Sequence, residues 1–176
     1  MPVSDFPDVR WGSESSRLRR PAIKFASTRG GSWLLRTVTP LDRRLLLRTS
    51  GRFTLLGPVG APTVLLETTG AKSGLPRITP LIYVRDGDRL VVVGSNFGQA
   101  KHPAWSGNLL KNPDAVVIMG GQRIPVRAEL LSGQAAEDGY HLLSELAEAY
   151  TVYRGRTDRQ IRVFALTRKP GTSQAA

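Results

Sequence analysis

The sequence contains no cysteine and only two histidines among its 176 residues. Without cysteine the chain cannot form disulfides, thiolate zinc sites or iron–sulfur clusters, and it has no cysteine nucleophile. His102 and His141 lie far apart and neither has a carboxylate motif beside it, so no metal site is predicted. No apolar run approaches the roughly 18 residues of a membrane span, and the first residues hold no apolar signal-peptide core. We therefore expect a cytoplasmic, single-domain globular protein.

Signatures of several enzyme classes are also missing. No GxGxxG follows a predicted strand, which argues against a dinucleotide-binding fold, and no GxSxG occurs, which argues against a serine hydrolase. The run from Gly70 to Ser73 is similar to the end of a P-loop, but the earlier glycine is missing and a strand follows in place of a helix. Because the chain offers no obvious catalytic group, we expect its chemistry to belong to a bound cofactor.

Acidic residues are scarce: 14 Asp and Glu stand against 25 Lys and Arg, which gives a net charge of +11. This excess predicts an anionic partner. Many of the basic residues fall within residues 17–52, and one hypothesis is that this region contacts an anionic membrane surface at the inner face of the cell membrane. A solvated basic helix is the commoner outcome of such a composition. Nucleic acid is not expected, because no recognised binding motif accompanies the charge.

The chain divides into four predicted segments. Residues 1–17 are expected to form a flexible leader, residues 18–60 a basic helical extension, residues 61–168 the main domain, and residues 169–176 a disordered tail. Within the main domain, the alternation of apolar residues and the glycine-containing turns predict short strands and two helices. The strands are expected at 63–69, 77–85, 89–95, 115–119, 122–131 and 162–167, and the helices at 103–111 and 134–150.

These elements predict a mostly β (α+β) fold. Short strands joined by hairpins favour an antiparallel barrel with peripheral helices over a parallel sheet. Pro80 interrupts the second strand and is expected at an edge or a bulge, because proline cannot donate to a ladder.

The turn between the first two strands is a candidate phosphate site. The turn N–H groups freed by Gly70 and Gly74, the Ser73 hydroxyl, and the cations of Lys72 and Arg77 would converge on one anion. The alternative is an ordinary turn with solvated charges.

Two further segments are candidates for contact with a ligand. The strand end at Gly94 and Ser95 would approach a planar ring, and the helix that begins at Pro103 offers free N–H groups to an anion; the alternative is a plain loop with Trp105 in the core. Tyr150 and Tyr153 would share one helix face, either as core or as an aromatic wall over a ligand.

Together these segments resemble a known family. The runs LLETTGAKSGLPRITPL, RDGDRLVVVGSNFGQAKHPAWSGNLLKNP and YTVYRGRTDRQIRVFAL are similar to those of the deazaflavin (coenzyme F420)-dependent nitroreductases, which belong to the flavin split-barrel superfamily. The resemblance covers about residues 62–166. It implies an antiparallel split β-barrel with peripheral helices and a helical basic N-terminal extension, with the 8-hydroxy-5-deazaflavin coenzyme F420 as cofactor.

The resemblance also implies roles for individual residues. Lys72, Ser73 and Arg77 would hold the coenzyme phosphate. The following strand would lie along the coenzyme, and the next strand end would contact the deazaflavin ring. The short helix would add further contacts. The residues implied in these roles are Ile78, Thr79, Pro80 and Leu81 in the strand, Val93, Gly94, Ser95 and Asn96 at the strand end, and Ala104, Trp105 and Asn108 in the helix.

The implied activity is hydride transfer from the reduced coenzyme to a quinone, an enone or a nitro compound. Ser95, Tyr150 and Tyr153 are the candidate catalytic side chains, and Tyr150 is also the expected ring-side contact. Relatives carry a tyrosine where this chain has Ser106, and a third tyrosine where it has Ala147, so the acceptor side differs. FMN in place of F420, and a non-catalytic carrier of F420, stay open as alternatives. A homodimer is expected by analogy with other split barrels.

Overall fold

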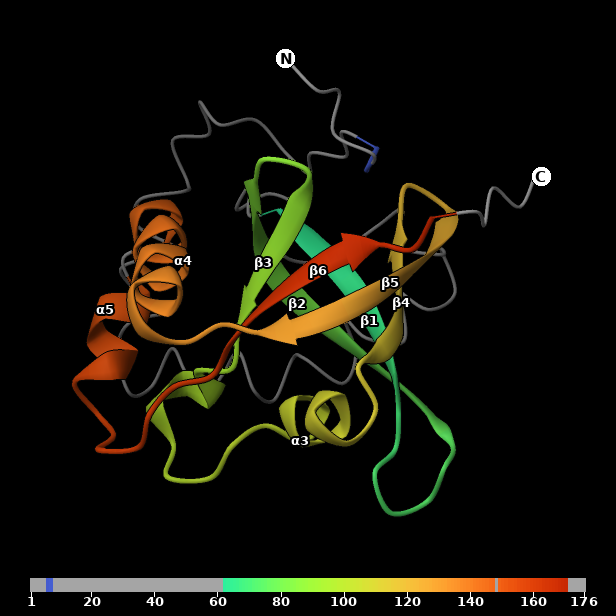
Figure 1. Cartoon of the computed structure of the whole chain (residues 1–176). Helices are drawn as coiled ribbons and strands as arrows, with labels where there is room; N and C mark the ends of the chain where they lie inside the picture. Colours follow the sequence, from blue (N-terminus) through green and yellow to red (C-terminus); the bar gives the residue numbers. More distant parts are fainter. Residues whose placement is uncertain (1–5, 8–61, 148, 171–176) are drawn as a thin grey trace.

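The computed structural model describes residues 6–7, 62–147 and 149–170 (Figure 1). The expected basic extension, including the proposed membrane-contacting residues 17–52, lies outside these residues, as do most of the expected leader and residues 171–176 of the expected tail. Two leader residues are described. The side chain of Phe6 is buried in the barrel core, and the main-chain oxygens of Phe6 and Pro7 accept hydrogen bonds from Arg85.

Six strands form one closed antiparallel barrel in the order β1-β2-β3-β6-β5-β4 (Figure 1). This confirms the predicted mostly β, antiparallel barrel with peripheral helices. The strands begin and end within one or two residues of the predicted positions. Their bounds are Thr63–Thr69 (β1), Pro76–Asp86 (β2), Arg89–Val93 (β3), Asp114–Met119 (β4), Gln122–Leu130 (β5) and Val163–Arg168 (β6).

Strand β2 divides its length between two neighbours. Residues 76–82 pair with β1, whereas residues 83–86 pair with β3. Pro80, which pairs with Leu65, therefore has a strand neighbour on one side only. This agrees with the expected edge position, since a proline on the unpaired side deprives no neighbour of a donor.

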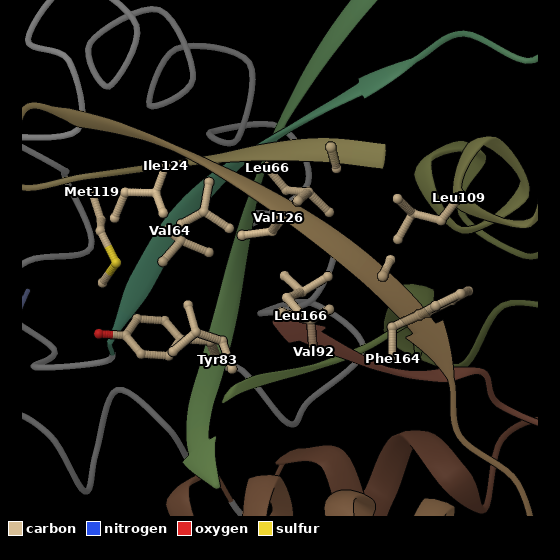
Figure 2. Packing of buried hydrophobic residues seen from close by; sticks show 14 of the residues in the cluster. Val64, Leu66, Tyr83, Val92, Leu109, Met119, Ile124, Val126, Phe164 and Leu166 are labelled. Carbon is tan, nitrogen blue, oxygen red and sulfur yellow. The ribbon is translucent and has the colours of Figure 1, made fainter. Parts of the chain in front are cut away.

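The barrel interior is a single apolar core. Alternate residues of each strand point inward, as expected for strands with one buried face. The short helix α3, Ala104–Lys111, closes one end of the barrel with two of its side chains, Trp105 and Leu109. The labelled side chains of this core are Val64, Leu66, Tyr83, Val92, Leu109, Met119, Ile124, Val126, Phe164 and Leu166 (Figure 2).

A second apolar cluster lies outside the barrel. Helices α4 (Gly133–Leu146) and α5 (Ala149–Arg154) lie along one side of the barrel next to β3 (Figure 1). Their buried side chains pack on the outer faces of β3 and β6; Tyr140, Leu143, Tyr150 and Tyr153 are buried against Val91, Val93, Val163 and Ala165. None of the described helices is long and apolar enough to cross a membrane.

The helical segment predicted over residues 134–150 is present, but the structure divides it into the two helices α4 and α5. Ala147 has an extended backbone with φ −142° and ψ 95°, and its carbonyl accepts the N–H of Tyr150. The sequence has no glycine or proline at this point. Burial of Ala147, Ala149 and Tyr150 against the barrel outweighs the helical preference of the segment.

We predict that α3 is held to the barrel mainly by Leu109. Leu109 is 2% exposed and Leu110 is 48% exposed, so the two adjacent leucines form a matched pair. Leu109→Ala should lower the free energy of unfolding by about 2–5 kcal/mol, because it leaves a cavity in the core. Leu110→Ala should change it by about 0.5 kcal/mol or less. Urea denaturation measures both, and equal losses would contradict the assigned packing.

Candidate functional site

The turn between β1 and β2 presents two cations without partners. Lys72 and Arg77 are both exposed, and no described residue forms a hydrogen bond or ion pair with either side chain. Ser73 is exposed beside them. The side-chain donors that the sequence predicted to converge are therefore available together on one turn.

The backbone donors differ from the expectation. The N–H groups of Gly70 and Gly74 are used inside the turn, on the carbonyls of Leu75 and Gly70 at 2.9 and 2.8 Å. The N–H groups left over in the described turn are those of Lys72 and Ser73. A Cβ at Gly70 would lie 2.6 Å from Ser73 Oγ and 3.1 Å from the Leu75 carbonyl oxygen, so a larger residue there would displace the Ser73 side chain. Gly74 is required because its φ is +67°.

Asn108 of α3 clamps this turn. Its Oδ1 accepts the N–H of Ala71 at 2.9 Å, and its Nδ2 donates to Thr68 Oγ1 at 3.0 Å. Lys111, one turn of helix further on, donates from Nζ to the Ala71 carbonyl at 2.6 Å. Asn108 is buried, so the structure places this predicted coenzyme contact where it supports the turn.

A cavity of about 360 Å³ lies beside the same turn, next to β1 and β4; of the residues named for the candidate phosphate site, only Gly74 lines it. Two carboxylates line it, Glu67 and Asp114. Arg123 pairs with Glu67 at 2.8 Å, and Lys169 pairs with Asp114 at 2.8 Å. Because its lining carries carboxylates that are already neutralised, this cavity does not suit a phosphate.

The residues predicted to lie along the coenzyme occupy the half of β2 that pairs with β1 alone. Ile78, Thr79, Pro80 and Leu81 are all half-buried, and among the described residues they pair with β1 alone. Their other edge is therefore open as far as the described strands are concerned.

The loop from Gly94 to His102 has an unusual backbone. Asn96 and Phe97 have φ values of 47° and 56°, in the left-handed region that residues other than glycine rarely adopt. Gly98 follows with φ 73°, and a Cβ there would lie 2.7 Å from the Tyr153 carbonyl. The loop is thus pressed against α5, and the Phe97 and Tyr153 rings meet edge to face at 5.7 Å.

Arg159 ties both ends of this loop together. Its guanidinium donates to the carbonyls of Gly94 at 3.0 Å, Ser95 at 2.6 Å and Gln99 at 2.9 Å. It also lies 3.1 Å from His102 Nδ1. Because arginine can only donate, Nδ1 accepts and the proton of a neutral His102 sits on Nε2. Desolvation, with repulsion from Arg162 and Arg159, lowers the pKa of His102 and favours this neutral form.

Two predicted catalytic side chains meet beneath the loop. The Tyr150 hydroxyl shares a hydrogen bond with the Ser95 side chain. Burial, with the nearby hydroxyls of Tyr153 and Tyr140, raises the pKa of Tyr150 well above its usual value, so the phenol keeps its proton at neutral pH. Ser95 and Tyr150 are 6% and 9% exposed, and both lie just under the surface.

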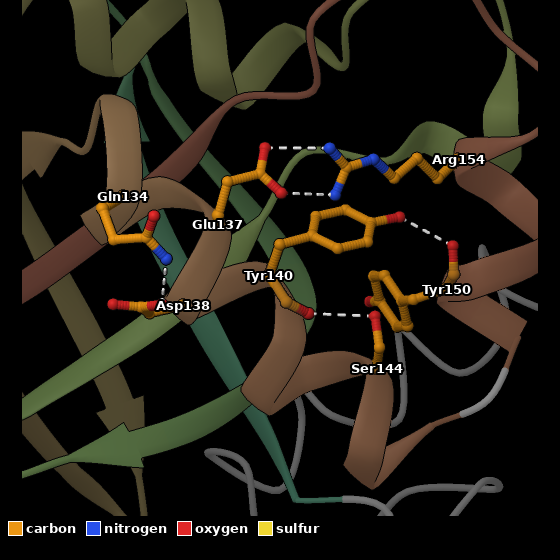
Figure 3. A network of polar contacts seen from close by, with 7 residues as sticks. All are labelled: Gln134, Glu137, Asp138, Tyr140, Ser144, Tyr150 and Arg154. Atoms are coloured by element: carbon orange, nitrogen blue, oxygen red, sulfur yellow. Dashed lines mark hydrogen bonds and ion pairs between the residues drawn. The ribbon is translucent and has the colours of Figure 1, made fainter.

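Helix α4 holds Tyr150 in place (Figure 3). The Tyr140 hydroxyl donates to the Tyr150 carbonyl at 2.6 Å, and Arg154 forms a two-pronged ion pair with Glu137. The Arg154 guanidinium also stacks over the Tyr140 ring at 5.0 Å. Burial raises the pKa of Tyr140 to about 12, so it remains a donor. Tyr153 packs edge to face on Tyr150 at 5.8 Å.

The remaining predicted contacts on α3 have different surroundings. Ala104 is exposed at the start of the helix, whereas Trp105 is 5% exposed and packs against Phe164 in the barrel core. Val93 is likewise buried, in the cluster under α4. Ser106, which replaces a tyrosine of relatives, is fully buried and accepts a hydrogen bond from Arg162.

The predicted residues therefore form two groups at one end of the barrel. The β1–β2 turn, α3 and the Asn96–Gly98 turn all lie at this end (Figure 1). The sequence analysis assigned no role to Arg159 or Lys111, whose contacts are with main-chain carbonyls. The only signal for Arg159 was its place in the Thr-Asp-Arg run of the third similar segment.

The six-stranded antiparallel barrel with helices on its outer face defines a protein of the split-barrel class. The sequence profile of the F420H(2)-dependent quinone reductase family matches residues 33–168. The chain therefore belongs to that family, and it is an oxidoreductase with coenzyme F420 as its cofactor. The expected coenzyme and enzyme class are confirmed.

Individual relatives agree with this assignment. The F420H(2)-dependent quinone reductase Rv1261c of Mycobacterium tuberculosis is 40% identical over 126 residues, which is 69% of this chain and 83% of that protein. A solved F420-H2-dependent reductase is 39% identical with a TM-score of 0.55, over 60% of this chain and 93% of that one. A solved domain-swapped dimer is 34% identical with a TM-score of 0.58, over 77% and 97%.

We predict that Asn108 sets the shape of the β1–β2 turn. Asn108→Ala should lower the free energy of unfolding by about 1–3 kcal/mol, because it leaves the Ala71 N–H without its partner and removes one of the two hydrogen bonds of the buried Thr68 hydroxyl. It should also speed tryptic cleavage after Lys72, measured by mass spectrometry on the folded protein. Asn112→Ala is the control, because the Asn112 side chain bonds the Asp114 N–H, outside the turn. Unchanged cleavage in Asn108→Ala would contradict the clamp.

Proposed function

We propose that this protein transfers hydride from reduced F420 to a quinone, with the coenzyme phosphate held at the β1–β2 turn. The observation that carries the proposal is the pair of partnerless cations, Lys72 and Arg77, beside the Ser73 hydroxyl. Together with the N–H groups of Lys72 and Ser73, they form the mixed set of charged and neutral donors that suits a phosphate. When bound, the reduced deazaflavin supplies the hydride from its C5 carbon.

From this turn the coenzyme would follow β2 toward the Gly94–His102 loop. The open edge of β2 at Ile78–Leu81 gives it a strand to lie along, and the loop gives the ring a main-chain surface at Gly94, Ser95 and Asn96. Three residues would act from α3. Asn108 would hold the turn, and Ala104 and Trp105 would shape the protein surface behind the turn.

The protein's contribution to the transfer would be positioning and hydrogen bonding. Ser95 would contact the ring or the acceptor, and Tyr150 would orient the Ser95 hydroxyl through their shared hydrogen bond. Tyr153 would support Phe97 from below. The protonated phenol of Tyr150 is a candidate proton donor, with Tyr153 or water as alternatives.

Quinones are the acceptors best supported, because the family and its curated relatives carry that name. Enones and nitro compounds share the same electron-poor character and are proposed as further acceptors. A homodimer is proposed as well, supported by the relative described as a domain-swapped dimer. Contact of residues 17–52 with an anionic membrane stays a prediction from the sequence.

We predict that loss of either free cation weakens coenzyme binding. Lys72→Ala and Arg77→Ala should each raise the Kd for oxidised F420 by about 10- to 100-fold, since each removes a charge-assisted contact of about 1.5–3 kcal/mol. Titration followed by coenzyme fluorescence measures this, with FMN in parallel.

Arg123→Ala is the matched control, because the Arg123 guanidinium is already paired with Glu67 and is not among the proposed phosphate ligands. If the wild type binds FMN and not F420, the barrel has a different cofactor. Binding of F420 that is unaffected by both substitutions would place the phosphate elsewhere.

We predict that the Tyr150 hydroxyl matters for turnover more than for binding. Tyr150→Phe should leave the Kd for F420 within about threefold and lower kcat/KM for menadione about 10-fold, the value of one hydrogen bond of about 1.4 kcal/mol. Tyr153→Phe, which keeps the ring against Phe97, should have a smaller effect. A nitroarene and an enone tested alongside define the acceptor range. A protein that binds F420 tightly but reduces none of the three would be a carrier.

A further inference from the structure

Arg159 makes an unusual set of contacts for a half-buried arginine. Four hydrogen bonds leave its guanidinium, three to main-chain carbonyls and one to His102. No carboxylate among the described residues pairs with it. Its hydrogen bonds therefore serve mainly to hold a backbone in one shape, and the fourth reaches the side chain of His102 at the end of the same loop.

The backbone it holds is strained. Asn96 and Phe97 both lie in the left-handed region. Asparagine tolerates this region, but for Phe97 it costs about 1–3 kcal/mol. Inside the loop, Gly98 donates to the Ser95 carbonyl, Gln99 to the Asn96 carbonyl, and Asn96 Nδ2 to the Lys101 carbonyl. Such a conformation persists only when the surroundings enforce it, and three local bonds around a single turn give limited support.

Arg159 supplies the missing constraint because it reaches both ends of the loop. One guanidinium nitrogen, Nη2, binds the carbonyls of Gly94 and Ser95 at the beginning, while Nε binds Gln99 near the end. The planar fork carries five N–H donors on three separate nitrogens, which lets it reach acceptors at both ends of the loop. The three donors of a lysine ammonium radiate from one nitrogen, so lysine should hold one end of the loop but not both.

We propose that Arg159 is the positioning residue that fixes the Gly94–His102 loop, and thereby presents Ser95 and Asn96 to the coenzyme ring. The second half of this inference rests on the proposed function. Arg159 itself faces the carbonyl side of the loop, so it acts through Ser95 and Asn96 and is not a catalytic residue. The effect of its loss should therefore appear first in the loop, before any coenzyme is added.

The experiment measures amide hydrogen exchange across residues 94–102 in the coenzyme-free protein, then the Kd for F420. In Arg159→Ala we expect exchange at Gly98 and Gln99 at least about 10-fold faster, and a Kd raised about 10-fold or more. Arg159→Lys keeps the charge and should fall between the alanine variant and the wild type in both measurements. Arg127→Ala removes the same charge from an exposed ion pair with Asp114, and should change neither.

Each outcome decides the inference separately from the proposed function. Unchanged loop exchange in Arg159→Ala overturns the positioning role, whatever the coenzyme does. Faster exchange with an unchanged Kd overturns the link between loop shape and the ring. If the wild type does not bind F420, the proposed function fails, while the exchange data still judge the loop. Should Arg159→Ala unfold, as read by circular dichroism, Arg159→Lys carries the same comparison.

Discussion

The division of β2 between two neighbours is the constraint on which the site depends. Because β2 leaves β1 before it joins β3, residues 76–82 pair with one strand only, and no other strand of the described part of the chain pairs with their second edge. The same long strand begins at the β1–β2 turn, so the turn's cations and the open edge follow one another directly along the chain. Strand β1 pairs with β4 along its other edge, and this pairing closes the barrel. The sheet as a whole therefore does not end in a free edge strand.

Side chains at this end of the barrel hold main-chain groups far more than they hold each other. Asn108 and Lys111 bind the backbone of Ala71, and Arg159 binds the backbone of the Gly94–His102 loop. A loop fixed in this way can offer its remaining N–H groups and exposed side chains to a ligand without reorganising first. The two loops of the proposed coenzyme site are thus shaped by residues from α3 and from the segment after α5.

The strands and the cationic turn could be predicted because local signals determine them. Alternating apolar residues define Thr63–Thr69, and the glycines around Lys72 define the turn. The break at Ala147 had no local signal, since it follows from burial against the barrel. Asn108 and Arg159 could be recognised because they lie in segments that resemble the family. Most of their contacts, however, are with backbone carbonyls and N–H groups, and such contacts leave no pattern of residue types in the sequence.

The distribution of charge explains why the site end stays cationic. Several carboxylates outside the two loops are neutralised locally: Glu67 by Arg123, Asp114 by Lys169, and Glu137 by Arg154. Around the two loops, by contrast, Lys72, Arg77, Lys101, Arg159 and Arg162 have no carboxylate partner among the described residues. Desolvation, together with repulsion from Arg162 and Arg159, lowers the pKa of His102 and so keeps its Nδ1 free to accept from Arg159. The excess positive charge that suits an anionic coenzyme therefore also maintains the loop that would receive its ring.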